Sequence, residues 1–528
     1  MKRFNVTGTC VGTEHYMVDI SGKLAEIVKL VEMKHYFTIN RARQFGKTTT
    51  LLHLKKELDG YEDYIVASIT FEDAGLGVFD SEEKFCNMFL EKISKALRFS
   101  NADKDFAKKW YCPKVTSVMK LGWHITDMCE DKKIILMIDE VDKSSNNELF
   151  LHFLGVLRAK YLARQGGMDF TFHSVILSGV TDIKNLKMKL INDGQHKTLK
   201  DEGRILNSPW NIAASFNVDM SFSAEEISSM LYEYEADKKT GMDVLALASE
   251  IHALTGGYPF LVSRACQCID EELNKNWSTE GVQEAARIIV EESNALFDDM
   301  TKNLENNSNL YDFMYDLLIV GETKTFVIDN PTIALANTFG YIKKRANGSK
   351  KIAVSNRIFE IRLTRYFASK DENMRISNRV HGIIYKDVIK DGKFDMAACL
   401  RKFAEHYKQI YTEKEVHFFE RHGRLLFLSF LKPLLNGQGN FYIESQFTDL
   451  RRMDIVVDFE GQQIIVELKL WKGDAHREKA YEQLLGYMEA KNADEGFLLT
   501  FDFRKQKTGE HIPVWVEFDG RKIFDVVV

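Results

Sequence analysis

The sequence contains few of the residues that mark linkers, disulfide frameworks or metal clips. Among its 528 residues there are 6 prolines and 7 cysteines, and the cysteines are scattered along the chain. Cys266 and Cys268 are close in sequence, but residues two apart on a helix point in different directions, so they make a poor metal clip. We therefore expect reduced thiols in a cytoplasmic protein, with no obvious flexible linker.

Long apolar runs and an excess of positive charge are also missing. The apolar stretch from Leu425 to Leu435 is interrupted by Ser429 and Lys432 and is too short to cross a bilayer, so we expect no membrane contact. The first eight residues lack the apolar run of a signal peptide. The formal net charge is −6, so any binding to nucleic acid must come from local basic patches.

Near its N-terminal end the sequence does contain a phosphate-binding pattern. Residues 36–40 read as a strand, residues 41–48 as a loop that ends in Gly-Lys-Thr, and residues 49–58 as a helix. Backbone N–H groups at a helix start receive phosphate oxygens, a lysine adds positive charge, and a threonine hydroxyl ligates Mg²⁺. The pattern predicts a site for ATP and Mg²⁺ formed by Arg43, Gly46, Lys47, Thr48 and Thr49. Arg41 replaces the usual first glycine, so this loop alone is weak evidence.

A second motif supports the first. Residues 133–138 form an apolar strand, typical of a buried parallel sheet, that ends in Asp139 and Glu140. Acids at the carboxyl end of such a strand lie at the crevice where ligands bind. In an ATPase, Asp139 would hold Mg²⁺ through water and Glu140 would polarise the attacking water. Ser178 or Thr181, after a later strand, is either a sensor of the γ-phosphate or a plain loop residue.

The middle of the chain reads as helical. Ser223 to Glu226 is a capping box, and Arg264 on a later helix is either a second nucleotide sensor or a solvated arginine, with the second reading favoured. From Asn309, two helices and a hairpin around Gly348 read like a winged helix. Four basic residues lie in that hairpin, although a charged hairpin is usually just solvated: Lys344, Arg345, Lys350 and Lys351.

Close to the C-terminal end, two predicted strands gather acids. Met453 to Phe459 and Gln462 to Leu470 are joined by Glu460-Gly461, a plausible two-residue turn. In that register Asp454 faces Glu467, and Lys469 lies on the same face. Two close carboxylates suit Mg²⁺ or Mn²⁺, which would polarise a phosphodiester, while the lysine orients water or neutralises charge. The alternative is a surface hairpin with a cross-strand ion pair.

The following helix, residues 475–490 with Asp474 as its N-cap, places Lys479, Gln483 and Tyr487 on one face. This order of Asp, Glu-x-Lys and Gln-x-x-x-Tyr resembles the PD-(D/E)xK nuclease superfamily. The resemblance implies that Asp454 and Glu467 bind the metal, that Lys469 is catalytic and that Gln483 is accessory. Glu420 and Glu444 either join this site or are surface acids, the second being favoured. Lys472, Arg477 and Lys479 are expected to make salt-sensitive contacts to a nucleic-acid backbone.

Taken over almost the whole chain, the sequence resembles the bacterial AAA-ATPase-like family fused to a PD-(D/E)xK nuclease. The segments that carry the resemblance are residues 15–19, 41–48, 138–143, 178–182 and 208–213. It implies an α/β multidomain fold: a P-loop ATPase with a parallel sheet, a helical lid, a winged-helix-like connector and a restriction-endonuclease-like α/β domain. The expected domain bounds are 1–215, 216–305, 306–370 and 371–528.

Two hypotheses about function follow. The favoured one is an ATP-binding and ATP-hydrolysing protein whose Mg²⁺- or Mn²⁺-dependent nuclease domain cleaves nucleic acid, with DNA as the expected substrate and homo-oligomerisation through the ATPase domain as an open option. The alternative is a nucleotide-switched module that binds nucleic acid or protein through an inactive nuclease fold. The intact set of two acids and a lysine favours the enzyme.

Overall fold

The computed structural model of the chain describes residues 2–112, 114–144, 148–180, 210–320, 324–345, 350–372, 388–390, 392–410, 420–435, 439–442, 455–471, 473–502 and 512–528. Contacts divide the chain into two compact units. Unit 1 is Met1–Ala285 with Asn337–Gly340, and unit 2 is Ala286–Ala336 with Tyr341–Val528. The four expected domain bounds are finer than this division and stay predictions.

Unit 1 is built on a parallel sheet with the spatial order β1-β4-β3-β2. The strands span Tyr36–Asn40 (β1), Tyr64–Thr70 (β2), Lys133–Asp139 (β3) and Ser174–Gly179 (β4). Every residue of β3 after the exposed Lys133 is buried, as expected for a central strand covered on both faces. The sequence predicts β1, β3 and the later strand β4, and the prediction of a parallel α/β sheet is confirmed.

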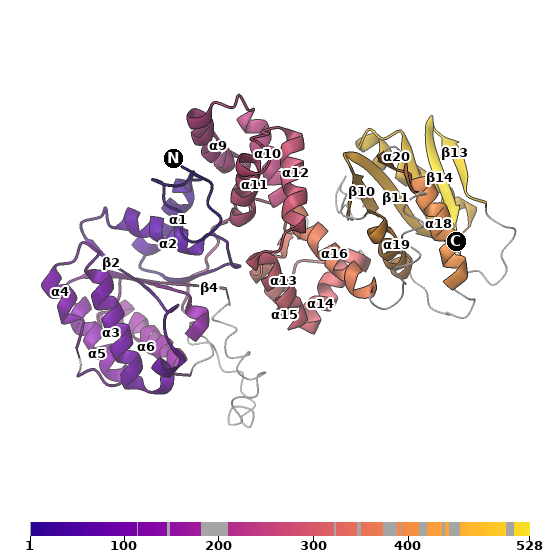
Figure 1. Cartoon of the computed structure of the whole chain (residues 1–528). Helices are drawn as coiled ribbons and strands as arrows, with labels where there is room; N and C mark the ends of the chain where they lie inside the picture. The colour runs from indigo at the N-terminus through magenta and orange to yellow at the C-terminus, as the bar shows by residue number, and fades with distance from the viewer. Residues whose placement is uncertain are drawn as a thin grey trace, which may run out of the picture. The chain divides into compact units, whose positions relative to one another are not determined.

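Helices cover both faces of this sheet (Figure 1). One face packs against α1 (Ser21–Glu32) and α2 (Lys47–Leu58). The other packs against α3 (Glu82–Leu97), α4 (Lys104–Lys109), α5 (Val118–Cys129) and α6 (Glu148–Gln165). Two short 3₁₀ turns, η1 (Leu76–Asp80) and η2 (Val141–Ser144), complete the layer. The sandwich leaves the carboxyl ends of the strands available for a site.

A group of helices follows the sheet. They are α9 (Ala224–Lys238), α10 (Val244–Thr255), α11 (Pro259–Glu271) and α12 (Thr279–Glu291). The predicted capping box is present, because the Ser223 side chain accepts from the Glu226 amide and the Glu226 carboxylate accepts from the Ser223 amide. Between α10 and α11, Gly257 has φ +70°, and a Cβ there would lie 2.0 Å from the Phe222 carbonyl oxygen. Only glycine fits this approach, which fixes α11 against residue 222.

Unit 2 begins with short helices and a small sheet. The elements are α13 (Ala295–Glu305), α14 (Ser308–Tyr315), the π-helical segment η4 (Asp316–Val320), α15 (Pro331–Thr338), β5 (Ile342–Lys344), β6 (Ile352–Val354) and α16 (Arg357–Glu372). β5 and β6 pair antiparallel, and Thr325 pairs antiparallel with Lys351 on the other side of β6. This is the helix-and-hairpin order that the sequence predicts for a winged helix.

The rest of unit 2 is a six-stranded mixed sheet with the order β13-β14-β12-β11-β10-β9. Its strands are β9 (Gly439–Tyr442), β10 (Ile455–Phe459), β11 (Gln462–Leu470), β12 (Glu495–Phe501), β13 (Val514–Phe518) and β14 (Arg521–Val527). A small hairpin precedes them, β7 (Ile389–Lys390) with β8 (Lys393–Phe394). The helices are α18 (Met396–Ile410), α19 (Glu420–Leu435) and α20 (Asp474–Ala490).

The helices cover opposite faces of this sheet. On β12, Phe501 packs against Phe403 and Tyr407 of α18, whereas Gly496, on the other face, lies under Leu484 and Met488 of α20. Glu467 lies on the same face of the sheet as Gly496. It pairs with Leu498, and Leu498 shares its face with Gly496 because the two are two residues apart on β12. The predicted nuclease-like α/β domain is confirmed as a fold, with α20 over the face that carries Glu467.

The β10–β11 hairpin has the predicted register. Ile455 pairs with Val466 and Phe459 with Gln462. Glu460 and Gly461 both have positive φ, 47° and 79°, as a two-residue turn with the twist of the strands requires. Met453 and Asp454 lie outside the described residues. The N-cap of α20 was predicted wrongly: the helix begins at Asp474, and Gly473 with φ 106° precedes it.

Candidate functional site

The loop between β1 and α2 has the geometry of an anion cradle. Gly46 caps α2 with φ 76°, a left-handed conformation that glycine adopts without a Cβ penalty. Thr50 ties this turn down, since its amide and its hydroxyl both donate to the Gly46 carbonyl, at 2.8 and 3.0 Å. The first amides of α2 therefore point out of the helix at a fixed place, ready for phosphate oxygens.

Lys47 is folded back onto this loop. Its side chain is buried, and Nζ donates to the carbonyls of Arg41 at 3.1 Å and Ala42 at 3.0 Å. Burial lowers the pKa of the Lys47 ammonium, and the carboxylates of Glu140 and Asp142 oppose that shift. A buried cation that is surrounded by carbonyl dipoles and nearby acids is well placed to meet an anionic ligand.

The two motifs meet at the carboxyl end of β3. The Thr48 hydroxyl donates to Asp139 Oδ2 at 2.7 Å, so a threonine and a carboxylate suited to Mg²⁺ already touch. Glu140 has φ 55°, a conformation uncommon for a residue other than glycine, and its amide donates to Asp139 Oδ1 at 3.0 Å. Burial raises the pKa of Glu140, and Lys47 opposes this rise. The structure thus brings together Lys47, Thr48, Asp139 and Glu140.

Arg43 and Thr49 take positions that the motif alone does not specify. Burial lowers the pKa of Lys47 and raises that of Glu140, and the nearby Arg43 guanidinium adds to the first shift and opposes the second. The Tyr258 hydroxyl donates to the Arg43 carbonyl at 2.5 Å. The Thr49 hydroxyl accepts from the Cys10 amide at 3.2 Å, so in this structure it holds the N-terminal segment.

The two sensor candidates differ. Ser178 is buried at the end of β4, next to Ile39 of β1, and its hydroxyl has no hydrogen-bond partner among the described residues. Thr181 lies outside those residues. Arg264 is paired on its own helix, since Nη1 contacts Glu272 at 2.7 Å and Gln267 at 3.3 Å. The Arg264 side chain is about 14% exposed, so it is an ion-paired arginine rather than the solvated one that the sequence favoured.

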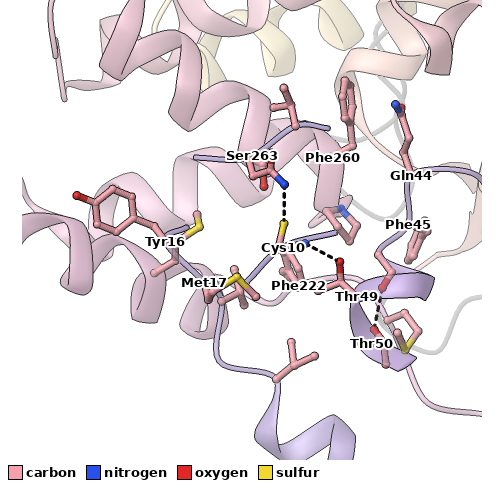
Figure 2. Close-up of a pocket in the computed structure, with 18 of the residues that line it drawn as sticks. Cys10, Tyr16, Met17, Gln44, Phe45, Thr49, Thr50, Phe222, Phe260 and Ser263 are labelled. Carbon is pink, nitrogen blue, oxygen red and sulfur yellow. Dashed lines mark hydrogen bonds between the residues drawn. The ribbon is translucent and has the colours of Figure 1, made fainter. Parts of the chain in front are cut away.

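Beside the phosphate loop lies a cavity of about 370 Å³ that sequence reasoning did not find. Figure 2 shows residues of its walls, which come from separate parts of unit 1. The walls are formed by residues between positions 5 and 20, Lys23 of α1, the start of α2 with Gln44 and Phe45, a stretch around Met220 and Phe222, Met230 of α9, and the start of α11 with Phe260 and Ser263. The lining is largely apolar and closes directly onto Gly46, Thr49 and Thr50.

The N-terminal segment that forms one wall is fastened to α9. The Asp19 amide donates to the Ser229 hydroxyl at 2.9 Å, and the Tyr16 hydroxyl donates to Asp237 at 3.2 Å. Lys23 forms an ion pair with Glu226. The sequence offered one signal for this wall, the segment His15 to Asp19, but nothing in it indicated contact with a helix more than 200 residues away.

The second candidate site lies on β11. Glu467 is fully buried, and Lys469 Nζ donates to its Oε1 at 2.5 Å, with about a quarter of the lysine side chain exposed. On α20, Gln483 Nε2 donates to the Tyr487 hydroxyl at 2.7 Å. The structure therefore brings together Glu467 and Lys469 and places Gln483 on the helix that covers their face.

The structure describes only some of the residues that the sequence predicts as metal ligands. Asp454 and Glu444 lie outside the described residues, and of Glu420 only the backbone, at the start of α19, is described. Within the described ranges no group of three or more His, Cys, Asp or Glu side chains is placed to hold a metal ion. The assignment of Asp454 and Glu467 as metal ligands stays a prediction.

A buried acid on the same face was missed. Asp525 of β14 is buried and accepts from Arg477 Nε at 2.6 Å and from the Tyr481 hydroxyl. Asp525 and Glu467 lie in one row across the sheet. Glu467 of β11 pairs with Leu498 of β12, and Asp525 of β14 pairs with the same Leu498 from the other side of β12. Arg477 thus fastens α20 to the sheet, and its expected contact with a nucleic-acid backbone stays a prediction. A single acid within an apolar strand gave no signal of this pairing.

Comparisons with known proteins identify two domains in this chain. The profile of the AAA-like domain matches residues 26–365, and that of the PD-(D/E)XK nuclease superfamily matches residues 440–512. An uncharacterized WD repeat-containing protein of Synechocystis sp. is 23% identical over 257 residues, which are 47% of this chain and 20% of that protein. The chain thus spans about a fifth of that relative's length.

Two solved structures are similar to part of this chain at low identity. A Walker-type ATPase of Pyrococcus abyssi has a TM-score of 0.46 and 11% identity, covering 68% of this chain and 99% of that one. The ORC2 protein of Aeropyrum pernix has a TM-score of 0.32 and 10% identity, covering 66% and 93%. None of the described helices is both long and apolar enough to cross a membrane. Since the first profile covers more than half of its residues, the chain belongs to the AAA-like domain family, and its C-terminal part belongs to the PD-(D/E)XK nuclease superfamily.

Proposed function

We propose that this protein binds and hydrolyses ATP with Mg²⁺ in unit 1 and hydrolyses nucleic-acid phosphodiesters, those of DNA first, in unit 2. The observation that carries the proposal is the contact of two motifs 91 residues apart, where the Thr48 hydroxyl meets the Asp139 carboxylate beside the buried Lys47. Structural roles alone do not require a buried lysine, a hydroxyl and two acids at the carboxyl ends of the strands of a parallel sheet.

The residues of unit 1 fit a nucleotide with its metal. The α2 amides and Lys47 would take the phosphate oxygens, and Thr48 with Asp139 would hold Mg²⁺. Glu140 would accept a hydrogen bond from the attacking water, for which its carboxylate must be ionised. The adjoining cavity of about 370 Å³ would receive the nucleoside, and its volume lies in the usual range for such pockets.

In unit 2, Glu467 and Lys469 carry the proposed nuclease chemistry. If the observed β10–β11 register continues by one pair, Asp454 would lie opposite Glu467. Asp454 would then supply the second carboxylate for a hard cation. Such a cation, when bound, would polarise the phosphodiester and lower the pKa of a water ligand. Lys469, already in contact with Glu467, would orient that water or neutralise charge that develops on the phosphate.

The test uses the full chain with matched variants in both units. ATP hydrolysis is compared between the native protein, Lys47→Ala and Lys56→Ala, an exposed lysine of the same helix. Cleavage of labelled duplex and single-stranded DNA and RNA is compared between the native protein, Glu467→Gln and Glu460→Gln, an exposed acid of the hairpin turn. Each assay is run with Mg²⁺, Mn²⁺ or EDTA, with and without ATP.

We expect Lys47→Ala and Glu467→Gln each to abolish one activity, while both controls remain like the native protein. Full ATP hydrolysis by Lys47→Ala would refute the nucleotide site. Nucleic-acid binding without metal-dependent cleavage in the native protein would favour the nucleotide-switched binding module over the nuclease.

A further inference from the structure

The outer face of α5 exposes large apolar side chains. Met119 and Trp123, one turn apart on this helix, are 59% and 62% exposed. A helix on the surface of a protein usually presents polar side chains to solvent, so these two residues depart from the pattern. The apolar residues that α5 buries lie on its opposite face: Val118, Leu121, Ile125, Met128 and Cys129.

Two more exposed aromatic residues lie beside this helix, one on each side. The His124 ring nitrogen Nε2 lies 3.2 Å from the carbonyl that precedes Tyr111. The Thr126 hydroxyl donates to Asp169 Oδ1 at 2.7 Å, next to Phe170. Residues 124 and 126 are about 200° apart around a helix, so the chain at Tyr111 and the chain at Phe170 flank the outer face. We call the outer face of α5, with these two neighbouring residues, the α5 face.

The apolar surface of the α5 face is large enough for a contact between proteins. Met119, Trp123, Tyr111 and Phe170 each expose about half of their surface or more. At about 200 Å² for a large side chain, they present about 400 Å² of apolar surface. An interface of standard size buries about 800 Å² on each partner, a little over half of it apolar. The α5 face therefore presents the apolar area that one partner contributes to a stable dimer.

Charged residues are ordered along the α5 face. Lys120 lies one turn before Trp123, Asp127 lies one turn after it, and both are exposed. Seven residues make about two turns, so Lys120 and Asp127 lie on the same side of the face. The exposed Glu130 and Asp131 follow. The α5 face is therefore positive toward its N-terminal end and negative toward its C-terminal end, with the tryptophan between the two halves.

A second copy of the chain is the partner that this pattern fits. In an antiparallel pair related by a twofold axis, the positive half of each helix faces the negative half of the other, and each side chain stays on its own side of the contact. With Trp123 near the axis, Lys120 of each copy would meet the partner's Asp127. A parallel pair would instead bring the two acidic halves together.

We propose that two copies of this chain dimerise through antiparallel packing of their α5 faces. The inference goes beyond the proposed function, because it concerns neither the nucleotide site nor the nuclease hairpin. It gives a surface to the homo-oligomer that the sequence left as an option.

The central tryptophan is tested by sedimentation equilibrium of the full chain at low salt, from below micromolar to about 100 μM. The variants are Trp123→Ala and Leu245→Ala, the second being a control of matched exposure, 60%, on α10. We expect a monomer–dimer equilibrium that Trp123→Ala weakens by about 30-fold or more, because a buried central tryptophan dominates such contacts. Leu245→Ala should dimerise like the native protein. A native protein that stays monomeric at the highest concentration, or equal dimerisation of Trp123→Ala, would overturn the proposal.

A charge exchange tests the antiparallel arrangement. Lys120→Glu and Asp127→Lys should each weaken the dimer by about 10-fold, because each sets like charges against each other at two symmetric contacts. The double variant Lys120→Glu/Asp127→Lys should recover, since it forms the same pairs in reverse. Circular dichroism at concentrations where every protein is monomeric establishes that the variants keep the native fold. Failure of the double variant to recover would overturn the antiparallel packing.

Crosslinking identifies the contact directly. Unlabelled and nitrogen-15-labelled copies are mixed and treated with a carbodiimide, which joins a lysine to a carboxylate in contact with it. A linked peptide of mixed isotope that joins Lys120 to Asp127 can come only from two copies, and it is the expected result. Links from α5 to another part of the same chain, with no mixed-isotope pair, would show that the chain covers this face itself and would overturn the dimer.

Discussion

Gly257 allows the geometry of the cavity wall to be tested with a matched pair of substitutions. A Cβ at Gly257 would lie 2.0 Å from the Phe222 carbonyl oxygen, whereas real Cβ contacts are essentially never under 3.0 Å. The Phe222 segment would have to move by about 1 Å. Gly241 has a similar φ, +77° against +70°, but a Cβ there meets nothing within 4 Å. Gly241→Ala therefore measures the cost of the left-handed backbone alone.

The magnitudes follow from these contacts. Alanine in the left-handed region costs about 1–2 kcal/mol, and this cost is common to both variants. Gly257→Ala also disturbs the hydrogen bond from the Phe222 amide to the Gly257 carbonyl, which is 2.8 Å long. Losing a buried hydrogen bond adds about 2 kcal/mol, so the two variants should differ by about that amount.

Hydrogen exchange of peptides that contain Phe222 is the direct assay. A difference of about 2 kcal/mol makes the Phe222 amide exchange about 30-fold faster in Gly257→Ala than in Gly241→Ala. Because Phe222 lines the cavity, calorimetry should also show weaker ATP binding for Gly257→Ala only. Equal exchange in both variants would refute the close approach, and native ATP affinity in Gly257→Ala would refute the assignment of the cavity to the nucleoside.

Four other predictions concern the candidate sites. Glu140→Gln should keep ATP binding but slow hydrolysis by about 10²-fold or more, whereas Asp139→Ala should also weaken Mg²⁺-dependent binding; identical defects would contradict these roles. Because burial raises the pKa of Glu140, hydrolysis should decline, as the pH falls, at a higher pH than an ordinary glutamate would give, and a profile flat into that range would contradict a base at this position. Lys469→Ala should keep metal binding by calorimetry and lose cleavage, and cleavage that survives both this change and EDTA belongs to another site. Asp525→Asn should lower the free energy of unfolding by about 3 kcal/mol, because it leaves the Arg477 guanidinium without its carboxylate. Asp519→Asn, at an exposed turn residue, should change the free energy of unfolding little.

Local patterns predicted the parts of the fold that local physics controls. The register of the β10–β11 hairpin followed from Glu460-Gly461, because a two-residue turn leaves one pairing for the strands on either side. The buried strand β3 followed from an unbroken apolar run that ends in two acids. The meeting of Thr48 and Asp139 followed from the rule that strand carboxyl ends share one edge of a parallel sheet.

The cavity beside the phosphate loop lay beyond such reasoning, because its walls come from segments more than 200 residues apart. Cys10 meets Thr49, and Tyr16 meets Asp237, through contacts between a segment without regular structure and helices that follow it. Neither periodicity nor turn chemistry specifies such a contact. The same limit applies to Thr49. The motif predicts it beside the nucleotide, whereas in the structure its hydroxyl accepts a hydrogen bond from the Cys10 amide.

Asp525 illustrates the same limit inside a regular sheet. Its strand, β14, is largely apolar in sequence. The role of Asp525 follows only from the pairing of β14 with β12 and from the packing of α20 over this face, where Arg477 donates to the carboxylate. Arg477 and Tyr481 are one helical turn apart on α20, so one carboxylate accepts from both and fixes the helix over the row that contains Glu467. The position of Gln483 on that helix thus depends on an acid two strands away from the nuclease hairpin, which is why Asp525→Asn should affect cleavage as well as stability.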